Sequence, residues 1–87
     1  MKVRVKLYAT LFDLVPASIR ARMPEMRPAR PFELELPEGS TLADLVNQLA
    51  LPPAEIKAIF VNGRAQSLDH GLQPEDEVGI FPPVGGG

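Results

Sequence analysis

The sequence predicts an α+β fold in which a mixed sheet of four to five strands packs on one main helix. Two observations support this prediction. Several short segments alternate apolar and polar residues, and one segment, residues 41–49, has the apolar spacing of an amphipathic helix. At 87 residues, 45% hydrophobic and 23% charged, the chain has the size and composition of one globular domain. We expect residues 1–81 to form this domain and residues 82–87 to form a flexible, Gly-rich tail.

Alternation of apolar and polar residues indicates the strands. The predicted strands cover residues 2–8, 32–36, 56–61, 64–68 and 77–81. In the first of them, Val3, Val5 and Leu7 alternate with basic residues. The turn at residues 37–39 makes the second strand a hairpin partner of the first. Asn62-Gly63 predicts another hairpin, because both residues tolerate a positive φ.

The main helix begins at Thr41, which stands three residues before Asp44 with the spacing of a capping box. Its apolar positions, which we assign to the core, are Leu42, Leu45, Val46 and Leu49. Pro52-Pro53 is expected to end it. A shorter helical segment is predicted at residues 10–15 and stops at Pro16. Its apolar positions are Leu11, Leu14 and Val15.

Residues 17–31 show no clear periodicity. Ser18 is a possible cap for a turn that runs through Met23, and the prolines at 24, 28 and 31 exclude a long helix. The segment contains Arg20, Arg22, Arg27 and Arg30, with Glu25 as its one acidic residue. Such a stretch is either a functional loop or a mobile one. We interpret it as mobile, because no aromatic residue lies between the arginines and their spacing does not suit phosphate binding.

Composition excludes several kinds of function. The net charge of −2 gives no reason to expect a nucleic acid partner, and no apolar run is long enough to span a membrane. Without a leader at the start, we expect a cytoplasmic protein. The chain has no cysteine, and no group of histidine and acidic residues has the spacing of metal ligands. His70 is the one histidine, and it stands in a turn next to a glycine. We therefore expect no enzyme active site and no bound metal or cofactor.

The last six residues, Pro82-Pro83-Val84-Gly85-Gly86-Gly87, offer a slender end without large side chains. Glycines add backbone entropy and no surface to bury, so they are not expected in the core. Pro82 and Pro83 favour an extended path away from the body. The reactive group of this tail is the carboxylate of Gly87, which is ionised at neutral pH. The tail therefore has the shape of a plug for a narrow partner channel.

The predicted order of strand, strand, helix, strand, short strand and strand resembles the MoaD/ThiS sulfur carrier family, and nearly the whole chain takes part. The segments that carry the resemblance are 37–42, 61–63, 69–72, 76–78 and 81–87. The ending Phe81-Pro82-Pro83-Val84 followed by glycines is most similar to the small, sulfur-carrying subunit of molybdopterin synthase. The resemblance implies a ubiquitin-like β-grasp, with the first and last strands side by side in the middle of the sheet.

The resemblance also implies a carrier cycle without catalysis by the chain itself. A ubiquitin-activating-type enzyme would use ATP to adenylate the carboxylate of Gly87, and a sulfur donor protein would convert it to a thiocarboxylate. The large subunit of molybdopterin synthase would consume this sulfur in building the molybdenum or tungsten cofactor. The glycines fit such a role because both partner sites must enclose the tip closely. The chain departs from the family pattern in two places. It ends in three glycines, of which Gly86-Gly87 match the terminal glycine pair of the family, and the connection formed by residues 17–31 is longer than the corresponding connection in the family.

Successive side chains of a strand point to opposite faces of the sheet, and this alternation predicts a docking surface. Tyr8, Phe60 and Phe81 fall on the sheet face opposite the helix, and in a β-grasp their strands are neighbours. We expect them to bind partners together with the tail residues Pro82, Pro83, Val84, Gly85, Gly86 and Gly87. The basic residues of the first strand are interpreted as a solvated strand face rather than as a docking stripe for an acidic partner: Lys2, Arg4 and Lys6.

Two other functions remain open from the sequence. The chain would be a ubiquitin-like modifier if Gly87 formed isopeptide bonds with lysines of other proteins, or a carrier for another pathway such as thiamine synthesis. It would be a simple β-grasp interaction module if the glycines had no chemical role.

Overall fold

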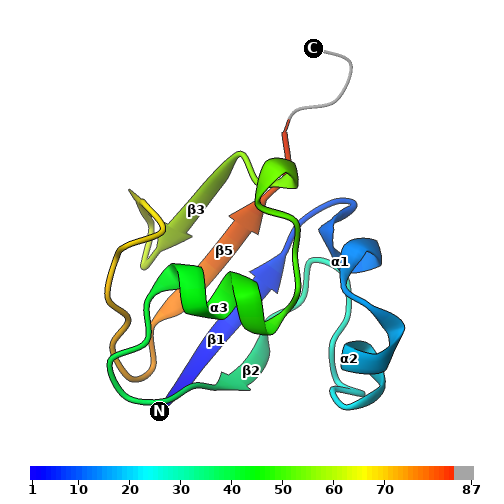
Figure 1. Cartoon of the computed structure of the whole chain (residues 1–87), viewed down its shortest axis with the longest axis horizontal. Coiled ribbons are helices and arrows are strands. Elements are labelled where there is room, and N and C mark those ends of the chain that lie inside the picture. Colours follow the sequence, from blue (N-terminus) through cyan, green and yellow to red (C-terminus); the bar gives the residue numbers. More distant parts are fainter. Residues whose placement is uncertain (84–87) are drawn as a thin grey trace.

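The structure is a computed structural model and describes residues 1–83 (Figure 1). The predictions for Val84, Gly85, Gly86 and Gly87, including a flexible tail, lie outside the described residues. In chain order the elements are β1 (Lys2–Leu7), α1 (Leu11–Leu14), α2 (Ala17–Ala21), β2 (Phe32–Glu35), α3 (Leu42–Gln48), the 3₁₀ helix η1 (Pro53–Glu55), β3 (Ala58–Val61), β4 (Arg64–Gln66) and β5 (Glu77–Phe81).

The five strands form one mixed sheet in the order β2-β1-β5-β3-β4. β1 pairs antiparallel with β2 and parallel with β5, so the first and last strands lie side by side in the middle. β3 pairs antiparallel with both β5 and β4. The β3–β4 hairpin turns at Asn62 and Gly63, whose φ values are 51° and 85°, as a tight turn with two left-handed residues requires. The predicted strand order and both hairpin pairings are confirmed.

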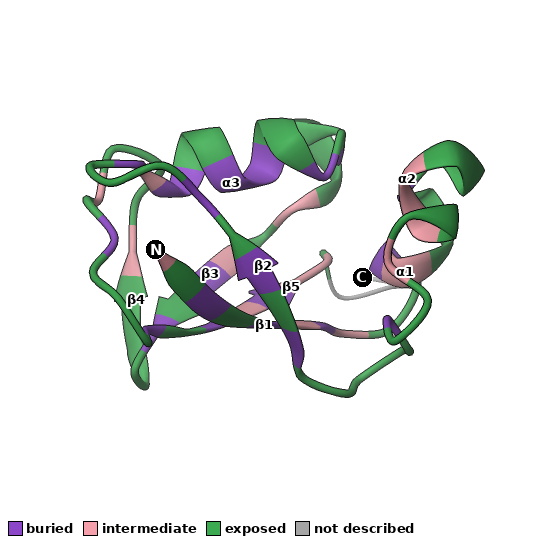
Figure 2. Cartoon of the chain, turned by 90° about the horizontal axis from the view of Figure 1, so that it is seen from below, coloured by how far each residue is buried: buried purple, intermediate pink, exposed green. Residues whose placement is uncertain are grey.

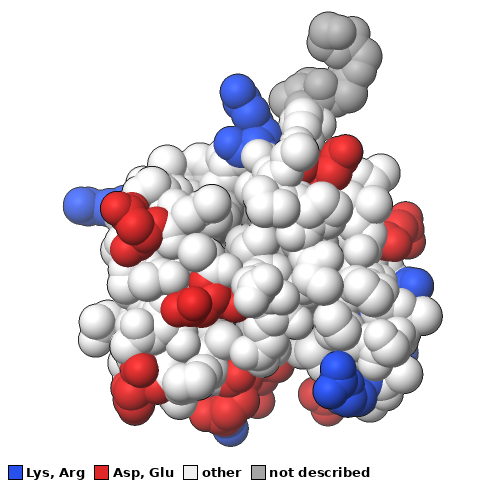
Figure 3. All heavy atoms as spheres, in the orientation of Figure 1, with Lys and Arg blue, Asp and Glu red and all other residues white. Residues whose placement is uncertain are grey.

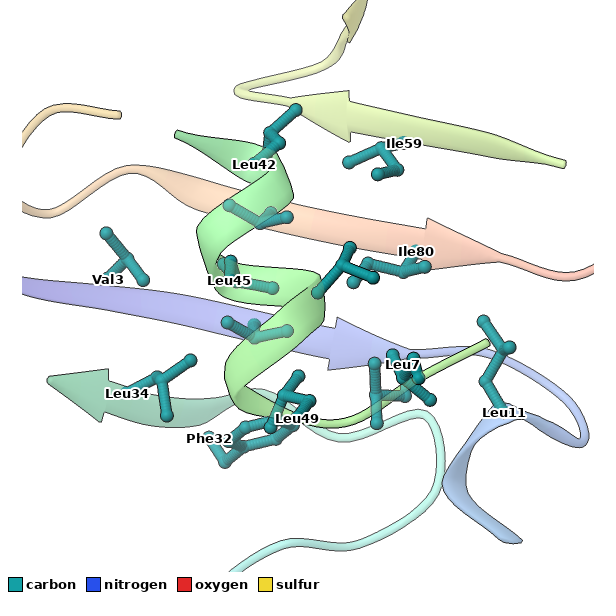
Figure 4. Packing of buried hydrophobic residues seen from close by; sticks show 14 of the residues in the cluster. Val3, Leu7, Leu11, Phe32, Leu34, Leu42, Leu45, Leu49, Ile59 and Ile80 are labelled. Carbon is teal, nitrogen blue, oxygen red and sulfur yellow. The ribbon is translucent and has the colours of Figure 1, made fainter. Parts of the chain in front are cut away.

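The hydrophobic core lies between α3 and one face of the sheet. Figure 2 shows α3 on one side of the strands, with its buried residues turned toward them. The alternating residues of β1 that face α3 are buried, as are the predicted apolar positions of the helix. In the close view of Figure 4, Leu45 of α3 lies over the central strands, with Leu42 and Leu49 at the two ends of the helix. The other face of the sheet has no helix packed on it among residues 1–83.

α3 begins as predicted and ends earlier than predicted. The Thr41 hydroxyl accepts a hydrogen bond from the Asp44 N–H, and the Asp44 carboxylate accepts one from the Thr41 N–H at 2.9 Å, which completes a capping box. The helix ends at Gln48, before the two prolines that were expected to end it, because Ala50 adopts a left-handed φ of 54°. The Leu51 N–H then donates to the Val46 carbonyl, which closes the helix with a Schellman motif.

Replacing Ala50 with glycine is expected to stabilise the protein. A left-handed conformation costs alanine about 1–2 kcal/mol, and glycine avoids that cost while losing some entropy on folding, so we expect a net gain of about 0.5–1 kcal/mol. For a domain of this size, that gain raises the melting temperature by about 2–8 °C. Thermal denaturation followed by circular dichroism measures it. Ala43→Gly, the same change at a helical position of α3, should instead lower the melting temperature, and equal shifts for the two variants would contradict the argument.

The segment 17–31 is more ordered than the sequence predicts. It contains α2, and Met26 is buried in the hydrophobic core. The Ala29 N–H donates to the Leu7 carbonyl at 2.8 Å, which fastens the segment to the end of β1. The Arg27 guanidinium donates to the carbonyls of Pro24 and Met26, so this arginine holds its own loop together. The interpretation as a mobile loop missed this packing, because a single buried methionine gives no periodic signal.

The short helix α1 also differs from its prediction in one position. Leu11 and Val15 are buried, whereas Leu14 is exposed to solvent. Phe12 packs partly against the core in its place, and the guanidinium of Arg20 lies 5.1 Å from the centre of its ring. A helix of one turn does not define its buried face by spacing alone. In the folded chain Leu11 and Val15 face the core, and Phe12 contacts Arg20 of α2.

Charged side chains are dispersed over the face of the molecule that carries α3. Figure 3 shows acidic groups separated by uncharged surface on this face, and among the described residues it has no continuous basic area. No helix within residues 1–83 is long and apolar enough to cross a lipid bilayer.

Candidate functional site at the root of the tail

The root of the tail is fixed in the middle of the sheet. β5 ends at Phe81 and leads directly into Pro82 and Pro83. The Phe81 carbonyl accepts a hydrogen bond from the Lys57 N–H at 2.8 Å, and the Ile80 carbonyl accepts one from the Tyr8 N–H at 3.0 Å. Strands on both sides therefore hold the last residues of β5. The body gives the tail a rigid and defined starting point.

An aromatic cluster lies at this root on the open face of the sheet. The rings of Tyr8 and Phe81 stack with centroids 4.1 Å apart and planes 9° from parallel. Phe60 meets Phe81 edge to face at 5.5 Å. We call these three residues the aromatic patch. The prediction that they gather on the face opposite the helix is confirmed, whereas their role in binding partners stays a prediction.

The strand registers explain why the three rings meet. Phe60 of β3 pairs with Gly79 of β5, and Gly79 pairs with Lys6 of β1, so one row of residues crosses the open face. Tyr8 and Phe81 lie two residues further along their own strands and therefore belong to the next row on the same face. A shift of one residue in either pairing would turn a ring into the core.

The charged residues of the open face are mostly paired. Lys2 lies 3.9 Å from Glu33, and Arg4 lies 3.6 Å from Glu77. These are exposed ion pairs, each of which contributes at most about 1 kcal/mol to stability. This pairing agrees with the interpretation of the basic row of β1 as a solvated face. Lys6 differs, since its ammonium group lies 5.4 Å from the centre of the Tyr8 ring.

Elsewhere in residues 1–83, His70 and Asp76 lie in turns that contact α3 and the sheet. No group of three or more His, Asp or Glu side chains within residues 1–83 is arranged to hold a metal ion. The backbone carbonyl of His70 accepts a hydrogen bond from the Leu42 N–H, so His70 lies in a turn that supports the start of α3. Asp76, which is buried, accepts hydrogen bonds from the Asn62 side chain and the Gln73 N–H, and it ties the β3–β4 turn to the start of β5.

A family model for the ThiS family matches residues 16–87, which is most of the chain. The chain belongs to the ThiS family. The match runs through the glycines of the tail, and it confirms the resemblance to MoaD/ThiS sulfur carriers. This ThiS family chain is thus a small ubiquitin-like protein of the carrier or modifier type, in a family whose members generally have no catalytic activity of their own. No curated protein sequence gives a significant match.

Solved structures place this ThiS family chain in the ubiquitin-like β-grasp fold. A putative molybdopterin converting factor subunit 1 from Pyrococcus furiosus is 28% identical, with a TM-score of 0.67 over 97% of this chain and 99% of that one. Small archaeal modifier protein 1 from Haloferax volcanii is 20% identical, with a TM-score of 0.66 over 95% and 98%. Subunits 1 and 2 of the molybdopterin-converting factor from Helicobacter pylori form a protein–protein complex. A chain of that complex is 19% identical, with a TM-score of 0.57 and full coverage of both chains.

Proposed function

We propose that this chain is the sulfur carrier subunit of a molybdopterin synthase, in the synthesis of a molybdenum or a tungsten cofactor. The observation that carries the proposal is the root of the tail. A central strand ends in the aromatic patch and leads through Pro82 and Pro83 to the glycines at the end of the sequence. The similarity to the putative molybdopterin converting factor subunit 1 from Pyrococcus furiosus supports molybdopterin as the pathway.

In this proposal the chain presents a carboxylate and its partners do the chemistry. An adenylating enzyme joins the Gly87 carboxylate to the adenylyl group of ATP and releases pyrophosphate. Sulfur at the oxidation level of sulfide, supplied by a sulfur donor, then attacks the acyl carbon and expels AMP, so that sulfur replaces one oxygen at Gly87. A free carboxylate resists this exchange, because oxide is a poor leaving group until it is activated. The large subunit, which is the counterpart of subunit 2 in the Helicobacter pylori complex, takes the sulfur.

The mass of the chain tests the proposal. After incubation with ATP, the adenylating enzyme and a sulfur donor, the intact protein should gain the mass difference between sulfur and oxygen. Fragmentation should place that gain on Gly87. A reaction without ATP is the control and should leave the mass unchanged. A chain that keeps its carboxylate under all conditions, while forming the adenylate, would contradict a sulfur carrier.

A protein modifier is the second candidate, and the similarity to the fold of small archaeal modifier protein 1 favours it. A modifier would pass Gly87 from the same adenylate to a lysine of another protein. Conjugates of higher mass, detected with an antibody in cell extract and lost after deletion of Gly87, would distinguish it. A carrier for thiamine synthesis would accept sulfur in the same way, but it would deliver that sulfur to a different acceptor enzyme.

Phe81→Asp is expected to weaken binding to the large subunit about 30-fold or more, because a charge would replace the central ring of the aromatic patch. Isothermal titration calorimetry with the folded variant measures this. Ala43→Asp places the same carboxylate on exposed α3 and should bind like the parent. Unchanged affinity for Phe81→Asp would refute the aromatic patch as a docking surface.

A further inference from the structure

The open face of the sheet contains a hollow of about 500 Å³ beside the aromatic patch. Gly79 of β5 forms its floor, because the registers place this residue directly between Lys6 of β1 and Phe60 of β3. The side chains of Lys6 and Phe60 therefore stand on either side of a position without a side chain. The hollow extends over β1, β5 and β3 on this face.

The residues two positions before and after Gly79 in β5, Glu77 and Phe81, stand at the two ends of this hollow. Phe81 and the Tyr8 ring stacked on it stand at the end nearest the tail. Glu77, paired with Arg4, stands at the other end. The hollow thus has two aromatic rings at one end, a third ring on one side and neutralised charges at the far end. Such walls suit an apolar side chain, which gains free energy by leaving water.

Gly79 keeps the hollow open. A Cβ atom at this position would lie 3.4 Å from Cε2 of Tyr8 and 3.5 Å from Cε1 of Phe81, which is ordinary contact. The two rings therefore border the position that a Cβ would take. A side chain longer than alanine would have to enter the hollow or displace the stack.

Lys6 brings a positive charge to the rim of the hollow. Lys2 and Arg4 each have a carboxylate within 4 Å, whereas no carboxylate of residues 1–83 forms an ion pair with Lys6, whose ammonium group lies near the Tyr8 ring. A cation at the rim of an apolar recess favours a partner that brings a carboxylate to the same place.

We propose that the hollow above Gly79 receives one apolar side chain of the large synthase subunit, and that a carboxylate beside that side chain pairs with Lys6. This inference rests on the proposed function and adds to it the residue that decides which partner side chain fits. A residue at position 79 with a side chain longer than that of alanine would block the contact without changing the tail. The hollow lies next to the root of the tail, so a seated side chain would also fix the direction in which Phe81 leads into Pro82.

The test is the Kd of the full-length chain, with its tail carboxylate unmodified, for the large subunit from the same organism. Gly79→Leu fills the hollow and should raise the Kd about 30-fold or more. Gly71→Leu is the matched control, because a Cβ at Gly71 meets no atom within 4 Å, and its Kd should equal that of the parent. Lys6→Glu reverses the free charge and should raise the Kd about tenfold at low salt and less at high salt.

Each result has a separate meaning. A folded Gly79→Leu chain that binds with the parent's Kd would overturn the inference, and the mass of the tail would still report sulfur acceptance independently. If Gly79→Leu does not fold, Lys6→Glu decides, and an unchanged Kd at both salt concentrations would overturn the inference. A parent chain that gains no sulfur and does not bind the large subunit would overturn the proposed function and this inference together.

Discussion

A chain that lacks Gly86 and Gly87 is expected to accept no sulfur while its free energy of unfolding stays unchanged. The shortened chain still ends in a carboxylate, on Gly85, but that carboxylate stands about 7 Å short of the original position along an extended path. It should not reach the catalytic groups of an adenylating enzyme that encloses a narrow tail. Stability should be unaffected, because the core and the strand pairing lie within residues 1–83. Mass spectrometry of the intact chain and thermal denaturation measure the two effects.

A chain amidated at Gly87 is the control for this prediction. It keeps every residue of the tail and removes only the ionisable oxygen that an adenylate requires. It should fail to gain sulfur as completely as the shortened chain does. If the shortened chain fails and the amidated chain succeeds, length is what matters and the carboxylate is not the reagent. A simple interaction module would keep its partner binding in both variants.

Leu45→Ala is expected to destabilise the protein by about 3–4 kcal/mol, within the range for fully buried leucines. Leu45 is 0% exposed and sits in the middle of the helix face that covers the sheet (Figure 4). Truncation leaves a cavity between α3 and the central strands, and neither layer can close it without breaking the strand pairing. A domain of this length has a total stability of about 4–13 kcal/mol, so the loss removes a large share of it. Urea denaturation followed by circular dichroism gives the value.

Asn47→Ala tests the same helix on its outer face. Asn47 is exposed, and alanine has the higher helix propensity, so the free energy of unfolding should change by no more than about 0.5 kcal/mol. If the two variants lose similar stability, the core does not lie where α3 meets the sheet. Both variants keep the tail, and Asn47→Ala should accept sulfur like the parent.

Local signals in the sequence predicted much of the fold. Alternation fixed which side of β1 and β2 faces the core, because the pleat puts successive side chains on opposite faces. The Thr41 capping box and the Asn62-Gly63 turn depend on contacts between residues at most three positions apart, and both form as predicted. The glycines of the tail were recognisable for the same reason, since what marks them is the lack of side chains rather than any contact.

Features that depend on contacts between distant segments of the chain could not be predicted from the sequence. The early end of α3 follows from the left-handed Ala50, a residue type that rarely marks a helix end. Met26 is buried in a loop that is fastened to the end of β1, and Phe12 rather than Leu14 packs against the core. None of these has a periodic signal. Their burial is decided by segments that arrive from elsewhere in the chain.

By itself, the sequence determined the strands, the helix, the faces they bury and the chemical character of the chain's end. Only the tertiary structure decided that Gly79 lies between Lys6 and Phe60, with the Tyr8–Phe81 stack beside it. The alternation of side chains along a strand assigns each residue to a face of the sheet. Which residues of neighbouring strands lie side by side on that face depends on the register between strands that are far apart in the chain. Register is set by the packing of the whole core, and so the recess beside the tail exists only in the folded protein.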